Sequence, residues 1–186
     1  MGTHRALRYG TIALILAAIT CGDIDKFTIE ESSSTTIQGA SLLEQLAGDL
    51  GFGGFLNMDI SQNQELQNQG VEREQIDSVH IQSLTLTITD TPPEGRDFTF
   101  IDNLEFFVES QGLERKLIAS GGPFAAGLTT VGLEVENVDL APYAAAESMN
   151  ITSEVTGRRP SKETTIDGKI VLEVDVNVSG ALCGGD

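Results

Sequence analysis

The side chains with the most reactive groups are few in this chain and lie far apart. His80 is the one histidine after the first 20 residues, and Cys183 lies in a Gly-rich end without a His or basic neighbour to activate its thiol. A Cys–His nucleophile pair would need these two residues to meet, and no local signature favours that. Gly-x-Ser-x-Gly and Walker-type phosphate loops are absent from the sequence. We therefore expect no catalytic residues, no enzyme activity and no bound cofactor, and we interpret His80 as a surface residue.

Acidic side chains could bind calcium, which needs several oxygens that converge on one loop. The Asp-x-Asp-x-Asp-Gly pattern of such loops does not occur. Two looser groups remain, one around a Pro-Pro turn and one at a strand end: Asp90, Glu94 and Asp97, and Glu134, Glu136, Asn137 and Asp139. We expect no metal site, and keep calcium binding as an alternative.

Charge excludes some classes of partner. The chain has 28 acidic and 11 basic residues, a net charge of −17. Such a surface repels nucleic acid, so we expect no DNA or RNA partner. Arg158, Arg159 and Lys162 form the one basic cluster, at a predicted hairpin tip. This tip is either a solvated turn or a contact for an acidic partner.

The first 20 residues have the pattern of a secretory signal peptide. Arg5 and Arg8 supply positive charge, and residues 11–19 form an apolar run too short to span a bilayer. Cys21 comes after Thr20, and no acidic residue precedes it. Without residues 1–20, the chain has 28 acidic and 9 basic residues, a net charge of −19.

Ala18, Ile19 and Thr20 followed by Cys21 resemble the lipobox of bacterial lipoproteins. The resemblance implies that signal peptidase II cuts before Cys21, which then carries diacylglycerol and palmitate and becomes the lipidated N-terminus. It implies that residues 1–20 are a signal peptide and that 21–25 are the anchored N-terminus and a short linker. Gly22, in place of Asp, implies the outer membrane. An ordinary signal peptide with Cys21 incidental is the alternative.

The clearest structural element is the stretch 166–179. Its aliphatic residues fall on even positions and its polar residues on odd ones, with Val171 as the one apolar exception. This period of two predicts a β-strand with one buried face. We expect the cover for that face to come from Leu84, Leu86 and Ile88 and from the apolar set between residues 98 and 108.

Other segments alternate in the same way. In residues 79–89 the phase slips at Gln82-Ser83, which indicates either a β-bulge or a strand that crosses between sheets. Asp102-Asn103 marks a kink in the 98–108 segment. Further strands are expected at 25–37, where the Ser/Thr-rich part favours a sheet edge, and at 56–60, 115–119, 131–135 and 149–155. A capping box at Ser41 with spaced leucines predicts a helix over about ten residues, and 139–147 a shorter one.

About eight short strands without βα alternation predict an all-β, two-sheet antiparallel sandwich, immunoglobulin-like or jelly-roll-like, over residues 26–183. A small closed barrel is the alternative. We expect a non-enzymatic envelope lipoprotein, anchored through Cys21 and facing the periplasm or the outside, with a structural or protein-binding role. The alternative is a secreted or tethered module that binds a glycan, calcium or a lipid.

Overall fold

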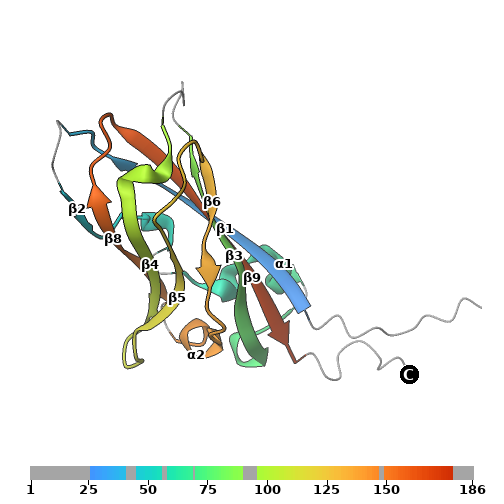
Figure 1. The fold of residues 1–186 in the computed structure, drawn as a ribbon. Coiled ribbons are helices and arrows are strands. Elements are labelled where there is room, and N and C mark those ends of the chain that lie inside the picture. The colour runs from blue at the N-terminus through green and yellow to red at the C-terminus, as the bar shows by residue number, and fades with distance from the viewer. Residues whose placement is uncertain are drawn as a thin grey trace, which may run out of the picture.

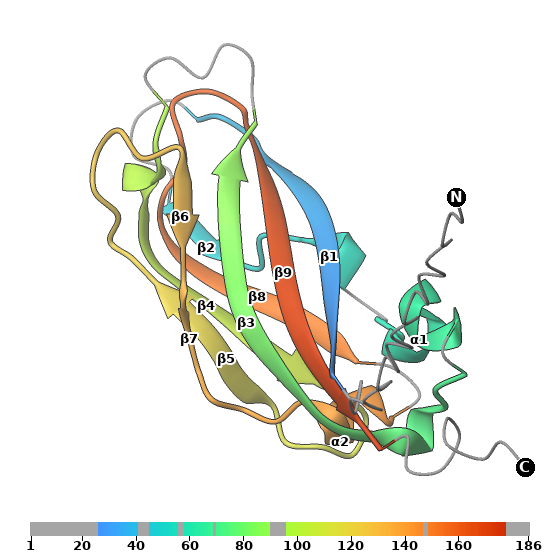
Figure 2. The same cartoon turned by 90° about the vertical axis from the view of Figure 1, so that its right-hand side faces the viewer.

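The two-sheet antiparallel β-sandwich is confirmed by the computed structural model, which describes residues 26–40, 45–55, 58–68, 70–89, 96–146 and 149–177 (Figures 1 and 2). The first sheet has the order β1 (Lys26–Ile37), β9 (Thr164–Val176), β3 (Ile76–Ile88) and β6 (Thr130–Gly132). The second has the order β2 (Gln45–Gly48), β8 (Asn150–Arg158), β4 (Ile101–Glu109), β5 (Lys116–Gly121) and β7 (Glu134–Val135). The described strands of one sheet do not continue into the other, so the closed-barrel alternative is wrong.

Strand β9 behaves as its alternation predicts. The even-numbered residues from Thr164 to Val176 are buried, and the odd-numbered ones, Val171 included, point outward and are half-buried or exposed. Gly168 interrupts the aliphatic row, and a Cβ there would lie 3.1 Å from the rings of Phe52 and Phe55. The missing side chain therefore leaves room for two aromatic rings in the core.

Both irregularities predicted from the sequence are present. The pairing of β3 with β9 shifts between Ile81 and Ser83, which is a bulge in one continuous strand. The bulge keeps the apolar residues on both sides of it buried on the same face. In β4 the pairing with β8 shifts between Ile101 and Asn103, where the kink was expected.

The expectation about which residues cover β9 was half wrong. Strand β3 is the neighbour of β9 in the same sheet, with Leu84 opposite Ile170 and Ile88 opposite Ile166 in the register. The opposite layer contains β4, whose residues Leu104, Phe106 and Val108 are fully buried. Alternation identifies the buried face of a strand but does not say whether a second strand of the same phase lies beside it or across the core.

Helices are few and short among the described residues. They are η1 (Gly53–Phe55), η2 (Ile60–Gln62), α1 (Gln64–Asn68), η3 (Arg73–Gln75), η4 (Phe98–Phe100) and α2 (Ala141–Ala144). Helix α2 confirms the helix predicted after Asp139, and α1 is a single turn within the Gln/Asn-rich segment. The strand predicted over 56–60 is reduced to one bridge between Met58 and Met149, followed by η2.

The helix predicted from Ser41 is wrong over its described part. Residues 41–44 lie outside the described residues, and Gln45–Gly48 form β2, which pairs with β8. Gly48 has a positive φ of 111°, which a helix does not accommodate. Beyond it, Asp49 accepts a hydrogen bond of 2.6 Å from the Ser153 hydroxyl of β8. Pairing with a strand more than 100 residues away in the chain therefore outweighs the local helix preference.

Replacing a buried residue of β9 should be far more damaging than replacing its outward neighbour. Leu172→Ala removes a fully buried side chain, so we expect a loss of about 2–5 kcal/mol in the free energy of unfolding. Val171→Ala is the matched control on the outer face, with an expected loss of about 1 kcal/mol or less. Urea unfolding followed by circular dichroism measures both, and equal losses would contradict the orientation of β9.

Candidate functional site

The most distinctive surface lies at the end of the sandwich where β1 ends and β9 begins. Three segments meet there: the connection from β8 to β9, the residues around η4, and the chain just after β1. The opposite end holds the start of β1 and the end of β9, since Lys26 is paired with Asp175 (Figures 1 and 2). We call the first of these the distal end.

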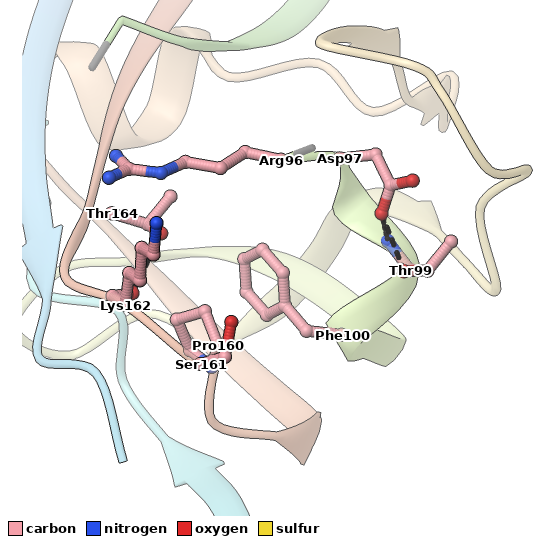
Figure 3. A pocket seen from close by; sticks show the side chains of 8 residues that line it. All are labelled: Arg96, Asp97, Thr99, Phe100, Pro160, Ser161, Lys162 and Thr164. Atoms are coloured by element: carbon pink, nitrogen blue, oxygen red, sulfur yellow. Dashed lines mark hydrogen bonds between the residues drawn. The ribbon is translucent and has the colours of Figure 1, made fainter. Parts of the chain in front are cut away.

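A small hollow of about 110 Å³ opens at the distal end (Figure 3). Arg96 reaches across it from the segment before η4, and Lys162 and Thr164 line it from the start of β9. Figure 3 shows the Arg96 guanidinium extended toward the side where Lys162 and Thr164 lie. The hollow thus presents two cationic groups that come from segments distant in the sequence.

A second hollow of about 190 Å³ adjoins the first. It contains two further cationic residues, Arg158 and Arg159, both exposed. The two hollows share four lining residues: Thr99, Phe100, Pro160 and Ser161. Phe100 and Pro160 are both buried. They form a fixed apolar floor between the basic pair of the first hollow and the basic pair of the second.

The backbone that carries these side chains is held tightly. The amide of Ala40 donates a hydrogen bond of 3.0 Å to the carbonyl of Pro160. A Cβ at Gly39 would lie 2.5 Å from the carbonyl carbon of Lys162, so only glycine permits this close approach. The buried Thr164 hydroxyl donates to the Lys162 carbonyl at 3.0 Å. The connection is therefore fixed before any ligand binds.

Asp97 is the one acidic residue among the described residues that line the two hollows. It caps η4 by accepting from the amide and the hydroxyl of Thr99, and it accepts from the amide of Gly127 at 2.8 Å. The hydrogen bond from the Thr99 side chain, together with that from Gly127, lowers the pKa of Asp97, so the carboxylate is charged at neutral pH. Its oxygens are engaged in holding the loop.

The described lining therefore contains four basic residues and one acidic residue, in a chain whose net charge is −17. Guanidinium and ammonium groups next to hydroxyl donors suit carboxylate, sulfate or phosphate oxygens. The distal end thus has the types of donor group that an anion site requires.

The sequence identified part of this site. Arg158, Arg159 and Lys162 were expected at a hairpin tip, and the hairpin is wrong: β8 and β9 belong to different sheets, so the segment between them crosses from one sheet to the other. The structure places Lys162 in the first hollow and the two arginines in the adjoining one. Arg96 was missed, because 62 residues separate it from Arg158 and only the packing of η4 beside the β8–β9 connection brings them near.

The acidic groups considered for calcium are not assembled into a cation site in the described structure. Asp90 and Glu94 lie outside the described residues, and the oxygens of Asp97 are engaged as above. Asp139 accepts from the amides of Val79 and Ala141 at 3.0 and 2.9 Å through one oxygen. No group of three His, Cys, Asp or Glu side chains within the described ranges could hold a metal ion.

The remaining residues considered for chemistry are one histidine, which the structure describes, and two cysteines, which it does not. His80 is half-buried on the outer face of β3, opposite Glu173 of β9, and its Nδ1 is buried without a described hydrogen-bond partner. The hydrogen bond and charge of Lys26 lower the pKa of Glu173. Cys21 and Cys183 lie outside the described residues, so the lipidation of Cys21 stays a prediction.

The class of protein that the structure defines is a two-sheet antiparallel β-sandwich. No family model matches the chain, and no curated protein matches it. Among solved structures it is similar to a decameric BFDV capsid protein, with 10% identity, 82% of this chain and 99% of that chain covered, and a TM-score of 0.39. A likeness this weak supports no argument about function. Within the described residues, no helix is long and apolar enough to cross a membrane.

Asp97→Ala should loosen the distal end, because it removes the cap of η4 and the link to Gly127. We expect a loss of about 1 kcal/mol in the free energy of unfolding. Asp102→Ala is the matched control, an exposed carboxylate nearby, with an expected change within about 0.5 kcal/mol. Thermal or urea unfolding measures both.

The effect of Asp97→Ala should also depend on pH. The pKa of Asp97 is lower in the folded chain than its usual value, so the carboxylate stabilises the fold above the unfolded pKa of about 3.9. That contribution disappears as the pH falls through the lowered folded pKa. A difference between the variant and the unmodified chain that grew on acidification would contradict this assignment.

Proposed function

We propose that this chain is a lipid-anchored protein of the bacterial cell envelope with a non-enzymatic, protein-binding role. In this proposal residues 1–20 are a signal peptide, Cys21 carries the lipid, 21–25 form the linker, and the sandwich begins at Lys26. The observation that carries the proposal is the position of Cys21 one residue, Thr20, beyond the short apolar run 11–19, which follows Arg5 and Arg8. Gly22 favours the outer membrane.

The fold supports this arrangement. Only residues 22–25 separate Cys21 from the start of β1, and four residues span at most about 14 Å. The end of the sandwich at which β1 starts would therefore stay close to the bilayer. From there β9 extends over 13 residues, or about 40 Å at roughly 3.3 Å per residue.

A protein-binding role is supported by the location and the chemistry of the distal end. It would face away from the membrane, and it presents charged and hydroxyl donors on a rigid backbone. These groups suit recognition, since they offer hydrogen bonds and charge to a partner in the aqueous space. The alternative is a module that binds a glycan, calcium or a lipid. Within the described residues no acidic group is assembled for calcium, and a sulfated glycan at the basic hollows is tested below.

Lipidation can be tested with a matched pair of cysteine variants. Cells that express the full chain with radiolabelled palmitate should produce a labelled protein in the membrane fraction. Cys21→Ser should lose the label and leave the membrane, and Cys183→Ser should keep both properties.

Globomycin, which inhibits signal peptidase II, should make the precursor accumulate. Label that persists in Cys21→Ser, or processing that is insensitive to globomycin, would overturn the anchor.

A further inference from the structure

We propose that the distal end binds a short acidic segment of a partner protein, with carboxylates in the two hollows on either side of Phe100 and Pro160. This deepens the protein-binding part of the proposed function and does not depend on lipidation. The evidence is the convergence of four cationic residues on the two hollows: Arg96 and Lys162 in the first, Arg158 and Arg159 in the second.

The concentration of positive charge is unusual for this chain. After Cys21 the sequence has nine Lys and Arg residues, and four of them line these two hollows. Other basic residues are in ion pairs along the sheets, such as Lys26 with Glu173 at 3.1 Å and Lys169 with Glu30 at 2.7 Å. Arg96 and Arg159 also take part in interactions, whereas neither Lys162 nor Arg158 has a side-chain ion pair or hydrogen bond with a described residue. Their donors are thus available to a ligand.

The site is already organised for binding. The Pro160 and Lys162 backbone is held by Ala40, Gly39 and Thr164 as described above, and the Asp97 carboxylate is engaged by Thr99 and Gly127. Among the four cationic side chains, a ligand would have to order the ends of Lys162 and Arg158, which keeps the entropic cost of binding low. Each hollow is of a size that suits one or two small acidic side chains rather than a large ring system.

The negative net charge of the chain favours a short anionic ligand over a long one. A long polyanion such as nucleic acid or a sulfated glycan would extend beyond the distal end and meet the acidic surface of a chain with a charge of −17. A segment of a few acidic residues touches only the hollows and avoids that repulsion. Apolar residues between the carboxylates could pack near Phe100 and Pro160. The geometry therefore favours an acidic peptide segment over an extended polyanion.

The test measures binding of a Glu-Glu-Leu-Glu-Glu peptide, blocked at both ends and carrying an uncharged fluorophore, to the full chain in a non-ionic detergent. The Gln-Gln-Leu-Gln-Gln peptide is the ligand control. We expect saturable anisotropy changes for the acidic peptide alone, which weaken as salt is raised because the contacts are charged. The absence of carboxylate-dependent binding would overturn the proposal.

Two double variants locate the site. Arg96→Gln with Lys162→Gln should weaken binding by about tenfold or more, since two charge-assisted contacts are lost. Arg158→Gln with Arg159→Gln is the second double variant. Both arginines are exposed, so this pair tests the site even if replacing the half-buried Arg96 disturbs the fold. Lys26→Gln with Lys169→Gln changes the net charge equally, away from the hollows, and should alter affinity by about twofold or less. Equal losses in distal and control variants would overturn the site.

Two further readouts separate the alternatives. A sulfated oligosaccharide of equal charge should bind more weakly than the peptide, and tighter binding through the same four residues would assign the site to a glycan and overturn the proposal. Palmitate labelling of Cys21 is measured on the same full-length chain. Normal labelling without peptide binding would reject this inference alone and leave the anchor in place.

Discussion

The structure depends on one strand, β9, which buries its whole even-numbered face and pairs along both edges. Its residues Ile166, Ile170, Leu172 and Val174 are fully buried, and each contributes roughly 1.5–3 kcal/mol of transfer free energy. On one side β1 pairs with it from Lys26 to Ile37 without a register shift, and on the other β3 follows it across two shifts. The first sheet is therefore long and continuous, and it fixes how far apart the two ends of the sandwich lie.

The arrangement of charge follows from this scaffold. Acidic residues are distributed along the chain, and the long sheet keeps the start of β1 away from the basic hollows at the distal end. The hollows exist because the β8–β9 connection packs beside η4 and is held by the segment after β1. In the proposed arrangement, the anchor at Cys21 and the anion-binding surface are at opposite ends of one rigid body, so the partner is met in the aqueous space.

Sequence reasoning succeeded where the deciding interaction is local or periodic. The alternation of β9, the bulge after Ile81 and the kink near Asp102 are all encoded in the positions of apolar residues along one strand. Sequence reasoning failed where the structure of a segment depends on a strand that is distant in the sequence. Residues 45–48 form a strand because β8 pairs with them, and Leu84 lies beside β9 rather than across from it because strand order is not contained in the alternation. The same limit explains Arg96: a basic cluster is visible when its members are adjacent, as in Arg158 and Arg159, but not when tertiary packing adds a fourth residue.

The spatial relation between the anchor and the distal end can be measured directly. In a Cys183→Ser background, Ser161→Cys places a fluorophore at the distal end, and Asp77→Cys places one near the start of β1, since Ile76 and Lys26 pair with adjacent residues of β9. Energy transfer to an acceptor on lipid head groups of a nanodisc reports the distance of each label from the bilayer. The label at position 161 should lie farther from the bilayer than the label at 77, by a distance that approaches the length of β9, about 40 Å. Equal transfer from the two positions, or stronger transfer from position 161, would contradict an anchored sandwich that presents its basic end to a partner.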